Sequence, residues 1–319
     1  MRVYYNITMN GFMELIRQPI YLVLMISSSV FMLTLASLYY VGAGEDPSMV
    51  LGGVLATIFL IGLFTAVLGA SLSVGEEIES GTALAVLSKP VGRISFILAK
   101  FSALAMALGL QCYTGCLAAL LSSRMAFDEY GSPDYPAFVI FGTGIVLACV
   151  IGVCINFFVM KPFTGPTVIS LVICLSIAFI AANYVDKEWG PQPFGNEIDW
   201  RMIQAVALIW LALCSIAGVA IACSTRLTLI PTLVCCLVLF LLGLVSDHFF
   251  GTQAEQGAYW AKFLYAMIPN WQQFWMADAL ANGNTLPWSY LAKCIQYVAG
   301  ILVITLGSAI LLFENRELS

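Results

Sequence analysis

Residues 50–73 read VLGGVLATIFLIGLFTAVLGASLS and contain no charged side chain. A helix of this length covers about 36 Å at 1.5 Å per residue, enough to cross the roughly 30 Å hydrocarbon core of a bilayer. Seven further apolar runs are of comparable length, and the predicted spans are residues 20–41, 50–73, 94–122, 136–159, 166–183, 204–223, 228–246 and 293–313. The sequence therefore predicts an all-α, polytopic integral membrane protein with about eight transmembrane helices.

The composition excludes an ordinary soluble domain and several classes of membrane enzyme. Hydrophobic residues make up 61% of the 319 residues and charged residues 10%, against about 45–50% and about 25% in soluble domains. His248 is the only histidine, too few for a haem protein that needs an axial ligand for each iron. The P-loop motif G-x-x-x-x-G-K-S/T is absent from the sequence. We therefore expect no catalytic residue and no enzyme activity on this chain, and no nucleic-acid partner.

An even number of spans places both ends of the chain on the same side of the membrane. With the N-terminus inside, eight of the thirteen Lys and Arg residues lie on the inner side: Arg2, Arg17, Lys89, Arg93, Lys100, Lys161, Arg226 and Arg316. Twelve of the eighteen acids then lie outside. The positive-inside rule favours this orientation, so both termini are predicted to be cytoplasmic.

Residues 1–19 have the pattern of an amphipathic helix that lies in the membrane interface. Apolar side chains recur at helical spacing at Tyr5, Met9, Phe12, Met13, Ile16 and Ile20. The opposite face carries Asn6, Asn10, Glu14 and Arg17 or Gln18. The helix either takes part in the function or serves only as a membrane-surface anchor.

Residues 248–291 form a long, predicted external segment of unusual composition. Residues 258–280 are aromatic and apolar but are interrupted by Pro269 and Asn270. Broken backbone can enter a membrane where it is buried against protein. We expect a partly re-entrant helical segment here, and the alternative is an amphipathic surface helix with an aromatic belt.

The predicted cytoplasmic loop 73–93 carries the strongest functional signal. Its acids Glu76, Glu77 and Glu79 mark the exit from the bilayer. Ser80 or Thr82 can cap a new short helix, predicted over residues 83–88 and closed before Pro90. The apolar side chains of this predicted helix, Leu84, Val86 and Leu87, need a surface to bury against. The loop is therefore either a docking element for a soluble subunit or a plain connection between two spans.

These residues also carry a resemblance to a known family. The run EEIESGT at 76–82, followed by LAVLSKPVGR at 84–93 and ILAKF at 97–101, resembles the E-E-x-x-x-G-T loop and coupling helix of type-2 ABC transporter permeases. The runs YAMIPNWQQFWMADAL at 265–280 and LLFENREL at 311–318 are similar to members labelled as permeases for multicopper-enzyme maturation. The resemblance frames residues 1–122 and about 204–319.

The resemblance implies a single transmembrane permease domain over residues 1–319, the membrane subunit of an ATP-driven exporter. Such a permease sits in the lipid of a bacterial cytoplasmic (inner) membrane and forms a homodimer or heterodimer. A separate cytoplasmic P-loop ATPase binds ATP and Mg, so no cofactor is expected on this chain. The implied ATPase-coupling residues are Glu76, Glu77, Gly81, Thr82, Leu84, Val86, Leu87 and, in a secondary contact, Arg226.

Two features leave alternatives open. Members of the family are usually described with six spans, so the pair within residues 136–183 is the expected insertion. None of the predicted spans has a charged residue near its middle, which disfavours a proton- or sodium-coupled carrier. A secondary carrier or a membrane scaffold without ATP coupling stays the alternative. The ten cysteines have no metal-binding spacing and are expected to fill the core, so no metal site is predicted, and the substrate-binding residues are unknown.

Overall fold

The computed structural model describes residues 2–38, 46–79, 92–127, 131–284 and 287–314. Over these residues the protein is all-α, with one isolated β-bridge between Val185 and Pro191. Eight helical segments are long and apolar enough to cross a membrane: Pro19–Ser37, Pro47–Ile78, Arg93–Met125, Tyr135–Val159, Thr164–Asn183, Met202–Ser224, Leu229–Gly251 and Trp288–Glu314. Each overlaps a predicted span, and the chain is a multi-span membrane protein.

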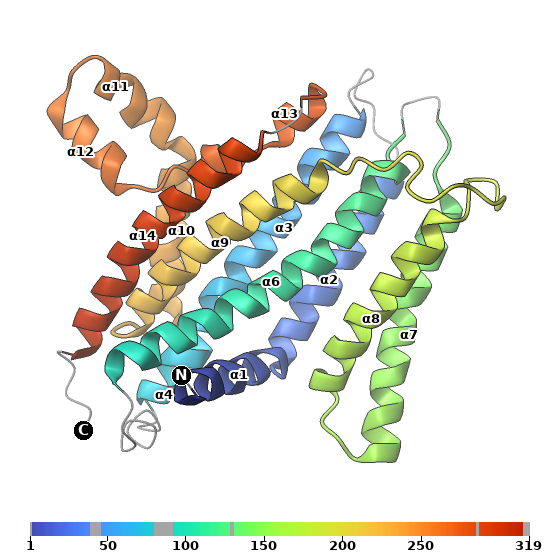
Figure 1. Ribbon diagram of the computed structural model, residues 1–319, viewed down its shortest axis with the longest axis horizontal. Helices are drawn as coiled ribbons and strands as arrows, with labels where there is room; N and C mark the ends of the chain where they lie inside the picture. Colours follow the sequence, from blue (N-terminus) through green and yellow to red (C-terminus); the bar gives the residue numbers. More distant parts are fainter. Residues whose placement is uncertain (1, 39–45, 80–91, 128–130, 285–286, 315–319) are drawn as a thin grey trace.

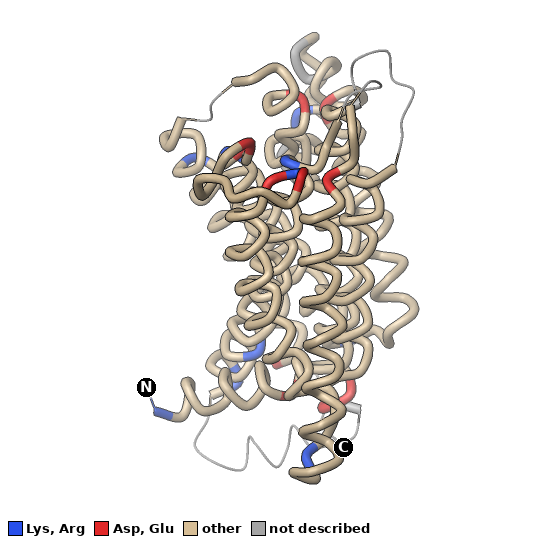
Figure 2. Tube along the Cα trace, turned by 90° about the vertical axis from the view of Figure 1, so that its right-hand side faces the viewer, with Lys and Arg blue, Asp and Glu red and all other residues tan. Residues whose placement is uncertain are grey.

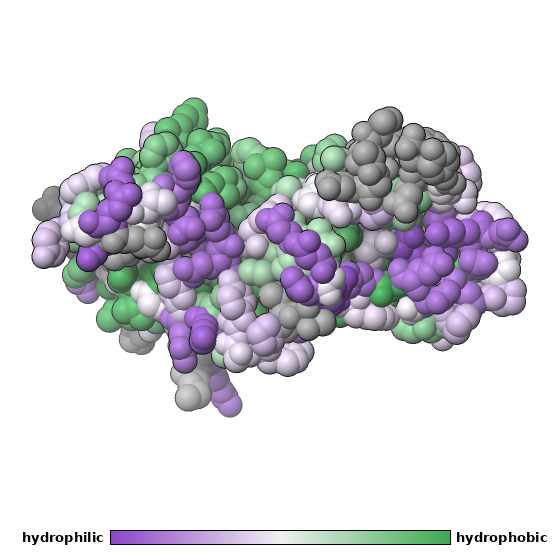
Figure 3. All heavy atoms as spheres, turned by 90° about the horizontal axis from the view of Figure 1, so that it is seen from above, coloured by the Kyte–Doolittle hydropathy of each residue, from purple (hydrophilic) through white to green (hydrophobic). Residues whose placement is uncertain are grey.

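The helices run side by side as one bundle, and both chain termini lie at the same end (Figure 1). We call this the α1 end, after helix α1 (Arg2–Ile16), and the opposite end the α13 end, after α13 (Ala277–Ala281). Charged residues gather at the two ends and leave the middle of the bundle uncharged (Figure 2). Seen from above, hydrophilic residues cover much of the α13 end, while hydrophobic residues appear around its rim (Figure 3). This distribution is the one that a bilayer around the middle of the bundle requires.

The remaining helices follow in chain order. The first half of the chain contains α2 (Pro19–Ser37), α3 (Asp46–Ala70), the π-turn η1 (Ser71–Gly75), α4 (Glu76–Glu79), α6 (Arg93–Met125) and α7 (Tyr135–Val159). The second half contains α8 (Thr164–Asn183), α9 (Met202–Ser224), α10 (Leu229–Ser246), the π-turn η2 (Asp247–Gly251), α11 (Thr252–Glu255), α12 (Tyr259–Met267), the 3₁₀ turn η3 (Trp271–Phe274), α13 and α14 (Trp288–Glu314).

The centre of the bundle consists of α3, α6 and α9, which pack closely through small residues. On α3, Gly62 lies directly against the side chain of Leu213 on α9, so a larger residue there has no room. On α9, a Cβ at Gly218 would lie 2.6 Å from Thr305 Oγ1 on α14. Lipid tails are as apolar as the helix surfaces, so the hydrophobic effect does not drive helices in a membrane together. Such helices associate through close van der Waals contact instead. Glycine at these positions supplies that contact.

Helices α7 and α8 form a hairpin that packs mainly on itself, beside the rest of the bundle (Figure 1). Gly152 lies directly against Thr167, and a Cβ at Gly144 would come within 2.9 Å of the Ala178 Cβ. The hairpin turn begins at Met160, whose φ of 55° is left-handed. The pair of spans expected within residues 136–183 is therefore present as one helical unit.

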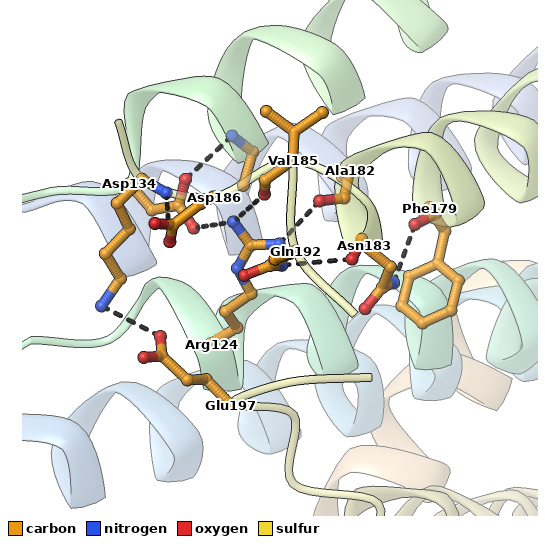
Figure 4. A network of polar contacts seen from close by, with 11 residues as sticks. Arg124, Asp134, Phe179, Ala182, Asn183, Val185, Asp186, Gln192 and Glu197 are labelled. Atoms are coloured by element: carbon orange, nitrogen blue, oxygen red, sulfur yellow. Dashed lines mark hydrogen bonds and ion pairs between the residues drawn. The ribbon is translucent and has the colours of Figure 1, made fainter. Parts of the chain in front are cut away.

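A buried ion pair ties this hairpin to α6 at the α13 end (Figure 4). Arg124 Nη2 lies 2.8 Å from Asp134 Oδ2, and both side chains are almost fully buried. The same guanidinium donates to the carbonyl oxygen of Ala182 in the last turn of α8, at 2.6 Å, and to that of Val185, two residues after α8 ends, at 2.7 Å. Asp134 Oδ1 also accepts from the Ala137 amide and so caps the start of α7. One arginine thereby joins α6 to both helices of the hairpin.

The segment after α10 leaves the bundle and returns into it. Its helix α12 has exposed Tyr259 and Trp260, whereas Trp271 in η3 is buried and lies directly against Gly243 of α10. Gln272 Nε2 donates to the Leu244 carbonyl at 3.0 Å. Gly243 precedes the end of its span at Gly251 by about 12 Å of helix. The chain therefore packs back against the bundle at η3, and a re-entrant path through the membrane over part of residues 248–291 stays a prediction.

We expect Asp134→Ala to destabilise the protein strongly, because it leaves Arg124 buried without its anion and removes the cap of α7. Breaking a buried pair from one side typically costs about 3–5 kcal/mol. The measurement is the thermal midpoint of unfolding in detergent. Unfolding is monitored through the reaction of newly exposed cysteines with a thiol-specific dye. Glu188→Ala, at an exposed acid of the same end, is the matched control and should leave the midpoint unchanged.

The double variant Arg124→Met with Asp134→Asn tests whether the two residues act as a pair. Because it leaves no unpaired charge in the interior, it should be more stable than the sum of the two single changes predicts. The midpoints of Arg124→Met, Asp134→Asn and the double variant are each compared with that of the unaltered protein. If the loss in the double variant equals the sum of the two single losses, the ion pair does not hold the hairpin.

Candidate functional site

The candidate site lies at the α1 end, where the second span leaves the bundle. This span runs unbroken over 32 residues, Pro47–Ile78, through the π-turn η1 into α4. A helix of that length covers about 48 Å, more than the roughly 30 Å of hydrocarbon requires. Residues 73–79, predicted as the first part of loop 73–93, are therefore helical, and Glu76 and Glu77 lie in the last helical turn before the rest of the loop. Single π-turns of this kind are frequent at functional sites.

Glu77 belongs to a three-residue ion network around the buried Lys100. Its Oε1 accepts from Lys100 Nζ at 2.7 Å, and the same ammonium lies 3.5 Å from Glu14 Oε2. The Lys100 side chain is only 4% exposed, whereas that of Glu14 is 45% exposed. A buried ammonium is strongly destabilising unless acceptors surround it. The network therefore holds α1, α4 and α6 together around one cation.

Helix α1 reaches this cation because of a glycine. A Cβ at Gly11 would lie 3.2 Å from the Ala103 Cβ and 3.7 Å from Lys100 Cδ, so glycine lets the two helices approach. The buried residues of α1 are Thr8, Gly11, Leu15 and Ile16. The sequence correctly predicted a helix here, and its predicted apolar face, assigned to the membrane interface, includes Tyr5, which is 63% exposed in the bundle. The face that packs on protein is the one that brings Gly11 and Glu14 toward α6.

Two arginines cap the end of α14 beside this network. Arg93 Nη1 donates to the Glu314 carbonyl at 2.7 Å, and its guanidinium lies 5.7 Å from the centroid of the Phe313 ring. Arg226 Nε donates to the Leu312 carbonyl at 3.1 Å. Carbonyls at a helix C-terminus have no intrahelical partner and carry partial negative charge, so both contacts are favourable.

The predicted loop 73–93 is therefore attached to the bundle on both flanks. On one flank α4 is held by the Glu77–Lys100 pair, and on the other Arg93 is held by the end of α14. The exit segment also meets α9, since Ser71 Oγ lies 3.4 Å from Ser224 Oγ.

The structure describes only part of the predicted site. Glu76 and Glu77 lie on α4, and Arg226 is exposed and bonded to α14. The predicted coupling helix lies outside the described residues, together with Gly81, Thr82, Leu84, Val86 and Leu87.

Sequence reasoning missed Lys100 and Glu14 as members of the site. Lys100 is the single charge inside an otherwise apolar run, and an ionisable residue in that position signals a required partner. That signal does not say which of the nearby acids supplies the partner. The ten cysteines are free thiols, and no group of three or more His, Cys, Asp or Glu side chains in the described part of the chain is placed to hold a metal ion.

The geometry of the network predicts an order of effects. We expect Lys100→Met to lower the thermal midpoint most, because Glu77 loses its cation in a buried setting, at a typical cost of about 3–5 kcal/mol. Glu77→Gln should follow. Glu14→Gln should cost less than about 1 kcal/mol, since its pair is longer and half-exposed. The thiol-dye melt of the four detergent-purified proteins measures this order.

Lys293→Met, at an exposed lysine, is the matched control and should behave as the unaltered protein. A midpoint for Lys100→Met equal to that of the control would contradict the network. Equal losses for Glu14→Gln and Glu77→Gln would contradict the assigned order.

Comparison with protein-family models, with curated proteins and with solved structures finds no match for this chain. The described geometry by itself establishes a multi-span, all-α membrane protein with a tied cluster of helix ends around Lys100.

Proposed function

We propose that this chain is the transmembrane permease subunit of an ATP-driven transporter, an exporter that couples to a separate cytoplasmic ATPase through loop 73–93. One observation carries the proposal: the E-E-x-x-x-G-T loop leaves a span whose end is tied through Lys100 to α1 and α6. Flanks attached to several helices would carry a force applied to the loop into α1, α6 and α14.

In the proposed mechanism the ATPase binds ATP and Mg, and its closure displaces the loop. The displacement passes through the Glu77–Lys100 pair to α6 and through Arg93 to α14. Charge-assisted hydrogen bonds suit this task because they are stronger and more directional than apolar contacts. The permease, working with a second copy or a related chain, then shifts between states of different access. The energy of the shift comes from contacts that differ between those states.

The distribution of charge favours a partner as the source of energy over an ion gradient. Gradient-driven carriers place ionisable groups within their spans. Here the charged residues of the described spans lie toward the ends of the bundle (Figure 2). On α6, Lys100 lies seven residues after the start of the helix and Arg124 one residue before its end. The ten cysteines and twelve methionines have no part in the proposed mechanism.

The test is a mild-detergent pull-down of the chain from its native membranes, followed by mass spectrometry and an ATP-hydrolysis assay. We expect a stoichiometric P-loop ATPase with the unaltered chain and none with the double variant Leu84→Asp and Leu87→Asp. The reason is that docking of the predicted apolar helix would fail once the side chains that contact the partner are charged. Membrane insertion, judged by protease protection, should be unchanged.

The matched control is Ser88→Asp, which adds a charge to the same loop without removing an apolar side chain and should keep the ATPase. Glu77 is left intact, because its loss would disturb Lys100 and confuse docking with stability. Retention of the ATPase by the double variant, or no ATPase in an extract where the unaltered chain stays folded, would refute the proposal.

A further inference from the structure

A large groove lies between α2, α3, α10 and the segment from η3 to α13. Its volume is about 860 Å³, within the range of small-molecule binding sites. The side chains that form most of its wall are Phe31, Ala56, Leu60, Phe240, Leu244 and Trp275. From Gly53 to Leu60 the groove follows about 10 Å of α3. It is long enough and apolar enough for an extended hydrocarbon chain.

The polar groups of the groove are few, and most are already bonded. Thr57 Oγ1 donates to the Gly53 carbonyl at 2.7 Å, and Gln272 Nε2 donates to the Leu244 carbonyl. Asp278, in the first turn of α13, is the one charged residue of the lining. This residue is exposed, and among the described residues no lysine, arginine or histidine borders the groove. The groove thus has apolar walls and a single negative charge.

A second groove of similar size provides a comparison within the same molecule. It lies along α7 and α8, has a volume of about 740 Å³, and has no charged residue in its lining. Membrane lipid can fill an apolar groove of this kind without any recognition of the head group. What sets the first groove apart is therefore the carboxylate of Asp278.

We propose that the groove of α2, α3 and α10 binds a cationic amphiphile. The hydrocarbon part of the ligand lies along α3 between Gly53 and Leu60, and its ammonium group pairs with the Asp278 carboxylate. The assignment of this ligand as a transport substrate rests on the function proposed above, while the binding itself does not. A neutral or anionic amphiphile of equal length lacks the charge complement and binds less tightly.

The test uses a photoreactive alkyltrimethylammonium probe on the purified chain in nanodiscs, without any ATPase. Peptides that carry the cross-link are located by mass spectrometry, so general partition into lipid is not counted as binding. We expect cross-links within residues 53–60 and 240–244. Ala56→Phe, which fills the groove, should abolish them, and Asp278→Asn should weaken binding about fivefold, as expected for one exposed ion pair.

Three controls accompany the test. Ala181→Phe fills the groove of α7 and α8 instead, and Glu188→Gln removes an exposed acid of the same end, so both should leave the cross-links unchanged. An alkyl sulfate probe with the same chain should label the groove at least fivefold less. Thermal midpoints establish that each variant is folded.

Equal labelling by the cationic and anionic probes, or full labelling of Asp278→Asn, would overturn the proposal. Labelling that survives in Ala56→Phe would overturn it as well. Because this experiment contains no ATPase and the pull-down contains no probe, the binding site and the proposed ATP coupling can fail separately.

Discussion

The structure depends on two buried cations, one near each end of α6, that must each find an anion. Lys100 is held by Glu77 and Glu14 at the α1 end, and Arg124 is held by Asp134 at the α13 end. A charge that is removed from water and left unpaired costs several kcal/mol, so the surrounding elements are obliged to supply carboxylates. Lys100 thereby joins α1 and α4 to α6, and Arg124 joins α7 and α8 to α6. The central helix organises both ends of the bundle through these two residues.

Between the charged ends, close packing takes over from polar contacts. Gly62 and Gly218 bring α9 against α3 and α14, and Gly243 makes room for Trp271. In lipid these glycines stabilise the packed helices, because they allow closer van der Waals contact between helices than acyl chains would provide. Burial of apolar side chains has this stabilising role in water. The return of η3 into the bundle follows the same logic, since broken backbone needs protein around it.

The two candidate sites lie at opposite ends of one helix. Helix α3 lines the groove over residues 53–60 and continues through η1 into α4, where Glu77 meets Lys100. Under the proposed function, a displacement of the loop after α4 would reach the groove along this single helix. The contact of Ser71 with Ser224 links the same path to α9. Under the proposed function, helix α3 and its continuation into α4 would by themselves connect the loop to the groove.

The sequence by itself determined the eight spans, including the pair within residues 136–183, and the break in the segment after α10. These features follow from local quantities, the length of an apolar run and the interruption at Pro269 and Asn270. Only the tertiary structure decided which acids pair with Lys100 and Arg124. It also decided that α1 packs through Gly11 and that Asp278 borders a groove on α3. Such pairings depend on the approach of helices distant in sequence, and apolar periodicity carries no information about that approach.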